Sequence, residues 1–169
     1  MSAETFTSAL FLITAIIAAG VLINAVFPVV YNMAGTFSSA SHESDQRIRT
    51  DFKIITTAAT TTTSPPTATI WIKNVGSSQI AYTDIYRSDV FCGTPGSFDR
   101  LTYTSGDPGD GFWTVYFTPG QEANLYWDPG ETIKVEAVSS NLPSTSGGQV
   151  YFQFILPNGI WRSTEFTAR

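Results

Sequence analysis

The chain has 169 residues, and its nine basic and fourteen acidic side chains give a formal net charge of −5. Proteins that bind nucleic acids need clustered Lys and Arg for the phosphates, so this composition argues against such a partner. The single cysteine, Cys92, excludes an internal disulfide and any metal site built from several cysteines.

The N-terminal part of the chain is an uncharged segment, residues 5–41, which contains an apolar run at residues 9–30. A helix rises 1.5 Å per residue, so this run would be roughly 33 Å long and would cross a bilayer core of about 30 Å. A cleaved signal peptide is the alternative, but such peptides begin with basic residues, whereas residues 1–8 carry only an acid. The pattern predicts a single retained membrane helix. Its expected anchor residues are Ala9, Leu12, Ile16, Leu22, Pro28 and Tyr31.

Within this helix, we expect Pro28 to produce a local break near the end of the span and Tyr31 to lie at the membrane interface. Met33, Phe37 and Ala40 then recur at three- and four-residue spacing, which predicts that the helix continues as a stalk. We therefore expect residues 1–45 to form the transmembrane helix and stalk. Residues 46–169 are long enough for one globular domain.

The second part of the chain contains short runs rich in Thr, Ile, Val and aromatic residues, separated by turn signals such as Pro95-Gly96 and Asp128-Pro129-Gly130. Expected strands are residues 52–59, 67–75, 79–91, 101–103, 112–117, 132–138, 150–156 and 161–166. Alternation along these strands places side chains such as Ile70, Ile133 and Phe152 on inward faces. The fold class expected is mainly β, an immunoglobulin-like antiparallel sandwich of two stacked sheets after the helix.

Catalytic and metal-binding chemistry has little support in the sequence. His42 is the single histidine and lies in a serine-rich segment without the partners that a catalytic histidine needs. Cys92 is expected to be a half-buried structural thiol, and Asp107 and Asp110 lie in a turn that lacks the further ligands of a calcium loop. The chain has no nucleotide-binding, hydrolase or metalloprotease motif, so we expect a non-enzyme without cofactor or metal.

Three stretches carry a resemblance to a known family: Ser2-Ala-Glu-Thr-Phe-Thr7 with its alanine-rich helix, Ile70-Trp-Ile-Lys-Asn-Val-Gly-Ser77, and Asp128-Pro-Gly-Glu-Thr-Ile-Lys-Val135. With them the chain resembles the archaellum-associated protein G and protein F family, over most of its length. The N-terminal segment and Pro28-Val-Val-Tyr31 are more similar to the G type than to the F type. The resemblance implies a stator-like role, with the helix in the cytoplasmic membrane and an external sandwich that self-assembles or binds surface-layer proteins.

Two other classes of protein share this layout. Archaellins and type IV pilins also join an apolar N-terminal helix to an external β-domain, but their precursors carry a short basic leader ending in Gly. Met1-Ser-Ala-Glu-Thr5 shows no such leader unless the N-terminus is already processed. In such a filament Glu4 would neutralise a neighbour's terminal amine; otherwise it is a solvated acid at headgroup level. A membrane-tethered binding module for carbohydrate or protein is the third class.

Orientation and partner contacts are the remaining expectations. Arg47, Arg49 and Lys53 follow the helix, so the positive-inside rule alone would keep the β-domain cytoplasmic, whereas the resemblance places it outside. The resemblance decides this prediction because these charges lie beyond the stalk. Trp113 and Trp161 lie near turns and are the expected anchors for a protein partner, together with Glu4. The alternative for either tryptophan is a place in the core.

Overall fold

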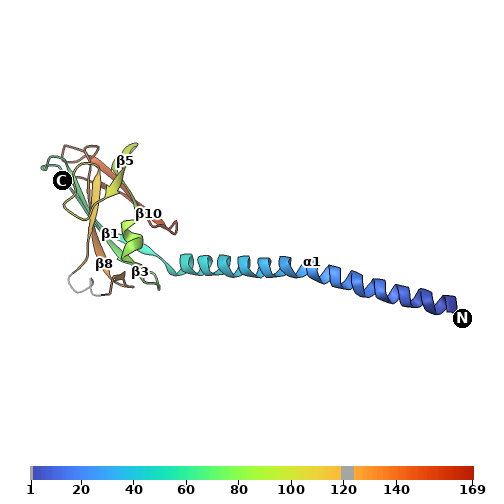
Figure 1. Ribbon diagram of the computed structural model, residues 1–169. Helices are drawn as coiled ribbons and strands as arrows, with labels where there is room; N and C mark the ends of the chain where they lie inside the picture. The colour runs from blue at the N-terminus through green and yellow to red at the C-terminus, as the bar shows by residue number, and fades with distance from the viewer. Residues whose placement is uncertain (1, 119–123) are drawn as a thin grey trace. The chain divides into compact units, whose positions relative to one another are not determined.

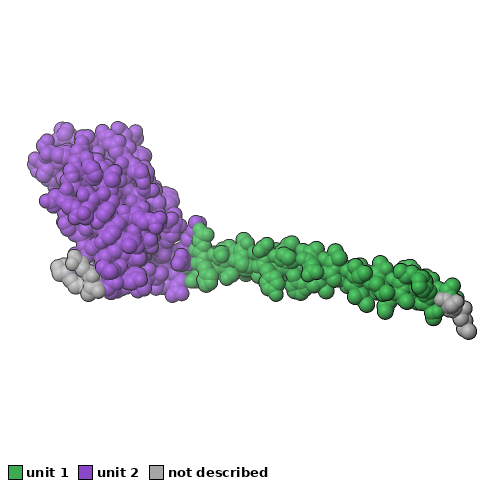
Figure 2. Space-filling model, viewed as in Figure 1, with its two compact units in different colours: residues 1–45 green, residues 46–169 purple. Residues whose placement is uncertain are grey.

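The computed structural model describes residues 2–118 and 124–169 of the chain. It divides into two compact units, Met1–Asp45 and Gln46–Arg169 (Figures 1 and 2). The first unit consists of helix, and the second contains every described strand.

The N-terminal helix α1 runs from Ser2 to Arg49, and its last turn, from Gln46 onward, belongs to the second unit. Pro28 lies inside the helix, which continues beyond it to Arg49, so the predicted break at Pro28 is wrong and the predicted helical stalk is confirmed. A proline removes one backbone donor but a long helix can continue through it, especially in an apolar environment. The hydroxyls of Thr7 and Thr14 donate hydrogen bonds of 2.8 Å to the carbonyls four residues earlier. These two polar groups are therefore satisfied within the helix.

After the last turn of α1, the described residues of the second unit form ten strands and one short helix. In chain order these are β1 (Phe52–Thr60), β2 (Thr67–Asn74), β3 (Ile80–Ala81), α2 (Tyr82–Tyr86), β4 (Asp89–Thr94), β5 (Ser97–Tyr103), β6 (Phe112–Tyr116), β7 (Tyr126–Trp127), β8 (Thr132–Val138), β9 (Gln149–Ile155) and β10 (Trp161–Thr167). Eight of them form a sheet in the order β1-β2-β8-β6-β5-β4-β9-β10, and β3 pairs with β7.

Strand β5 connects the two halves of the large sheet. Its residues 97–101 pair antiparallel with β4, where Leu101 lies opposite Val90, and its last residue, Tyr103, pairs in parallel with Trp113 of β6. The two outermost strands of the sheet, β1 and β10, also approach each other. The amide of Arg169, which follows β10, donates a 3.0 Å hydrogen bond to the carbonyl of Ala59 in β1. The expected β-sandwich is therefore confirmed, but it is made from one bent sheet with a parallel pair instead of two separate antiparallel sheets.

The sandwich core lies between the two halves of this sheet. Phe154 of β9 packs edge-on against Phe52 of β1, with ring centroids 5.5 Å apart, and against Trp113 of β6 at 6.0 Å. The inward faces predicted from alternation are confirmed, since their side chains are all buried: Ala68, Ile70, Ile72, Ile133, Val135, Ala137, Val150, Phe152, Phe154 and Leu156.

The segment predicted as one strand at residues 79–91 differs from the prediction. It forms β3, α2 and β4 in succession, because Tyr82 and Ile85 are three residues apart and bury the same side of a single helical turn. Short apolar runs do not distinguish a strand from such a turn. Strand β7, at Tyr126 and Trp127, was not predicted.

Candidate functional sites

The first candidate site is the apolar surface of α1. Among the described residues, this is the one helix that is long and apolar enough to cross a membrane. Its large side chains are exposed along the whole apolar run, including Leu12, Ile16, Leu22 and Tyr31. A helix that is apolar on all sides is typical of a segment that lipid or neighbouring helices cover. All six predicted anchor residues lie on α1, and their contact with lipid stays a prediction.

Glu4 lies exposed in the first turn of α1. A carboxylate at this position is stabilised by the helix dipole, whose positive end is at the N-terminus. The position is compatible with either expected role of Glu4, and both stay predictions.

The two tryptophans predicted as partner contacts have different environments. Trp113 is 1% exposed and packs against Tyr103 and Phe154, so the prediction is wrong for this residue. The sequence suggested a surface position because Trp113 follows a turn that ends at Gly111. The residue lies at the start of β6, and its side chain points inward. Trp161 opens β10 and is 52% exposed. Its contact with a partner stays a prediction.

The end of α1 is held by the loop that follows β2, inside the second unit. The carbonyl of Arg49 accepts hydrogen bonds from the amides of Ser77 (2.9 Å) and Ser78 (3.1 Å). The carbonyl of Asp51 accepts hydrogen bonds from the amides of Val75 (3.0 Å) and Gly76 (2.9 Å). The last carbonyls of a helix have no partner within the helix, and here the loop supplies donors in place of a capping side chain.

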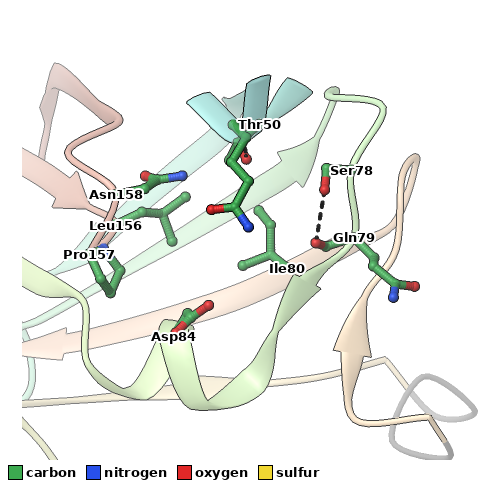
Figure 3. Close-up of a pocket in the computed structure, with 9 residues that line it drawn as sticks. Thr50, Ser78, Gln79, Ile80, Asp84, Leu156, Pro157 and Asn158 are labelled. Atoms are coloured by element: carbon green, nitrogen blue, oxygen red, sulfur yellow. Dashed lines mark hydrogen bonds between the residues drawn. The ribbon is translucent and has the colours of Figure 1, made fainter. Parts of the chain in front are cut away.

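A cavity of about 280 Å³ lies beside this loop (Figure 3). Side chains from four separate segments surround it: Gln46, Thr50, Ser78, Gln79, Ile80, Asp84, Leu156, Pro157 and Asn158. Ile80 and Leu156 are buried and form an apolar wall, whereas Asp84 extends from α2 toward the cavity (Figure 3). Sequence reasoning missed this cavity, because no local motif connects the four segments.

The groups considered for catalysis are not brought together. His42 is exposed on α1, whereas Cys92 is fully buried in the core, which corrects the expectation of a half-buried thiol. Burial raises the pKa of the Cys92 thiol to about 12, so it is protonated at neutral pH. A protonated, inaccessible thiol cannot act as a nucleophile. Asp110 has a structural contact, since its carboxylate accepts a 2.6 Å hydrogen bond from the amide of Ser140.

An exposed apolar helix of membrane-spanning length followed by a β-sandwich defines a class of single-helix envelope and filament proteins. The model of the archaeal-type flagellin family matches residues 9–166, so the chain belongs to this family.

Solved archaellum structures are similar to this chain. The archaellum periplasmic stator protein FlaG from Sulfolobus acidocaldarius is 27% identical with a TM-score of 0.51, over 69% of this chain and 99% of that one. The stator complex of FlaF and FlaG from the same organism is 26% identical with a TM-score of 0.52, over 68% of this chain and 87% of that one. The resemblance to the archaellum-associated G and F proteins is thereby confirmed.

Two further proteins match nearly the whole chain. The archaeal flagellum of Methanospirillum hungatei strain JF1 has a TM-score of 0.57 over 92% of this chain and 90% of that one, and at 15% identity it indicates the fold alone. An uncharacterized protein of Archaeoglobus fulgidus is 26% identical over 167 residues, which are 99% of each chain.

Proposed function

We propose that this protein is a non-enzymatic structural component of the archaellum, a stator-like protein anchored in the cytoplasmic membrane by α1. In this proposal the β-sandwich lies on the external side. The observation that carries it is the match to a periplasmic stator protein over 99% of that protein's solved chain, at 27% identity. The membrane-spanning length of α1 supports the anchor.

A structural role also agrees with the chemistry of the cavity. Its lining offers one carboxylate, on Asp84, together with amides, hydroxyls and apolar groups. Acid–base and nucleophilic catalysis need a reactive group with a second group that activates it. Partner binding is therefore the role that we assign to the sandwich, with further copies of this chain and archaellum or surface-layer proteins as its partners.

A filament subunit is the second candidate. It is favoured by the family model, which describes archaeal-type flagellins, and by a filament structure that matches both the helix and the sandwich. In a filament the apolar surface of α1 would contact neighbouring helices, whereas in a stator it would contact lipid. Both uses cover the apolar surface, so the location in the cell must distinguish them.

The test is to shear filaments from motile cells of the native host and to quantify this protein in the filaments and in washed membranes by mass spectrometry. The stator proposal predicts that the protein stays in the membranes and is absent from the filaments as a repeating subunit. Filaments composed of this protein, with a leader removed from its N-terminus, would instead establish the filament reading.

Topology needs its own test. A Ser163→Cys variant places a thiol on the exposed outer face of β10, while buried Cys92 gives little background labelling. Intact cells are treated with a membrane-impermeant maleimide, and lysed cells serve as the control. Labelling in intact cells is expected for an external sandwich. Labelling that requires lysis would place it in the cytoplasm, as the positive-inside rule alone suggests.

A further inference from the structure

We propose that the cavity beside the end of α1 binds the side chain of a lysine or arginine from a partner polypeptide. This deepens the proposed function and rests on it in one respect, that the protein works through contacts with other polypeptides. The cavity combines an apolar wall with a single carboxylate, and a basic side chain combines an aliphatic stem with a cationic head. The apolar wall therefore matches the aliphatic stem, and the carboxylate matches the cationic head.

The apolar part of the cavity fits the stem. Ile80 and Leu156 line the cavity and are almost completely buried, and the exposed ring of Pro157 lies beside Leu156 (Figure 3). Lysine and arginine cover such surfaces with their methylene groups while keeping the charge in a polar environment. A volume of about 280 Å³ is many times the roughly 30 Å³ of one water molecule, so it admits a side chain of several atoms.

The polar part of the cavity fits the head. Asp84 is half-buried on α2, and within the described chain its carboxylate takes part in no hydrogen bond or ion pair. The hydroxyl of Ser88 donates a 2.9 Å hydrogen bond to the backbone carbonyl of Asp84, and this bond does not involve the carboxylate. The carboxylate is thus available for a charge-assisted hydrogen bond, which is about twice as strong as a neutral one.

Amide groups that line the cavity add acceptors for the remaining donors of the cation. In the described part of the chain, the side-chain amide of Gln46 makes no hydrogen bond, whereas the side chain of Gln79 extends away from Asp84 (Figure 3). The side-chain oxygen of Asn158 accepts one hydrogen bond, 3.1 Å from the amide of Ile160, and a carbonyl oxygen can accept a second. An ammonium has three donors and a guanidinium five, so a carboxylate with further amide oxygens suits either head.

Other ligand classes fit less well. An anion would be repelled by Asp84, and among the described residues no basic side chain lines the cavity to offset that repulsion. A wholly apolar ligand would separate the carboxylate from water without providing a partner, which is unfavourable for a charged group. A tightly bound metal ion usually requires more than one carboxylate, and the described residues contain no group of three or more His, Cys, Asp or Glu suited to a metal.

The test titrates the isotopically labelled full chain in detergent micelles with N-acetyl-lysine methylamide and N-acetyl-arginine methylamide, followed by NMR. N-acetyl-norleucine methylamide is the matched control ligand, because it keeps the stem and lacks the charge. We expect saturable shifts of the backbone amides of Ile80, Asp84 and Asn158 with the basic ligands. Their affinity should exceed that of the norleucine ligand by about tenfold or more, the contribution expected from a charge-assisted hydrogen bond.

Variants locate the site. Asp84→Asn keeps the shape of the side chain and removes its charge, so it should weaken binding of the basic ligands by about tenfold. Asp107→Asn removes one negative charge from an exposed loop outside the cavity and should leave binding unchanged. Well-dispersed amide spectra of both variants verify that they are folded.

Three results would overturn this assignment: equal binding of the norleucine ligand, shifts that do not saturate, or full binding by Asp84→Asn. Competition by calcium at concentrations below those of the basic ligands would also overturn it, because the cavity would then be a metal site. None of these results bears on whether the protein is found in membranes or in filaments. Failure of this inference is therefore distinguishable from failure of the proposed function.

Discussion

The side-chain amide of Asn74 donates a 2.9 Å hydrogen bond to the backbone carbonyl of Trp127, and both residues are completely buried although 53 positions separate them. The same amide donates to the carbonyl of Ser78 at 3.0 Å, and the Asn74 side-chain oxygen accepts a 3.0 Å hydrogen bond from the amide of Gly76. One side chain thus connects the end of β2, strand β7 and the loop that holds the end of α1.

Replacing Asn74 by aspartate should disrupt this connection without changing the size of the side chain. A carboxylate cannot donate, so the carbonyls of Ser78 and Trp127 lose a partner inside the domain. We expect the free energy of unfolding to fall by about 2–4 kcal/mol, the cost of leaving the buried carbonyl of Trp127 and the half-buried carbonyl of Ser78 unsatisfied. Denaturant titration of the full chain in micelles, followed by tryptophan fluorescence, measures this. Ser163→Ala on an exposed face is the control, and an unchanged midpoint for Asn74→Asp would contradict the assigned role.

Replacing Gly76 by alanine tests how closely the loop approaches the end of α1. An added Cβ would collide with the carbonyl oxygen of Arg49 and would lie 2.6 Å from the amide nitrogen of Asp51. Both contacts are with backbone atoms, so the loop has to move, and we expect a loss of about 1–3 kcal/mol from this overpacking. Gly106→Ala is the matched control, because its Cβ meets no atom within 4 Å. Equal stability of the two variants would show that the loop adjusts freely.

Strand positions were predictable wherever one face of the strand is buried. Alternation identified Ile133, Val135 and Ala137 on β8, whose predicted and observed bounds are the same. Alternation carries no information about which strands become neighbours, so the parallel pairing of Tyr103 with Trp113 could not be predicted. The helical turn at Tyr82 was also missed, because a turn of five residues is too short to display a helical period.

Functional sites were predictable to different degrees. The helix is encoded in a continuous uncharged run, so its length and apolar character follow from local sequence. The cavity is formed by residues as distant as Gln46 and Asn158, and it exists only after the sandwich has folded. The sequence left Trp113 between a partner contact and the core, because aromatic residues near turns occur in both, and only the register of β6 distinguishes the two.

The ionisation of Cys92 should make the domain less stable at alkaline pH. Burial raises the pKa of this thiol from 9.0 to about 12, so between these values the native chain keeps a proton that the unfolded chain has lost. Unfolding then releases a proton, and the free energy of unfolding falls as the pH rises from about 9 to about 12. Below pH 9 this contribution is constant. Unfolding titrations across this range should show a smaller pH slope for Cys92→Ala than for the wild type, and equal slopes would contradict the prediction.

The membrane anchor is tested by a charge placed near its centre. Ala18 lies in the middle of the apolar run of α1, and its side chain is exposed on the helix surface. Replacing it with arginine should cost about 2.5–3.5 kcal/mol on insertion scales, because a cation at the bilayer centre loses its hydration. We therefore expect less of the Ala18→Arg protein in membranes after alkaline carbonate washing, whereas Ala18→Leu should be retained like the wild type. Intact wild-type protein in the soluble fraction, or full retention of both variants, would mean that α1 does not span the membrane.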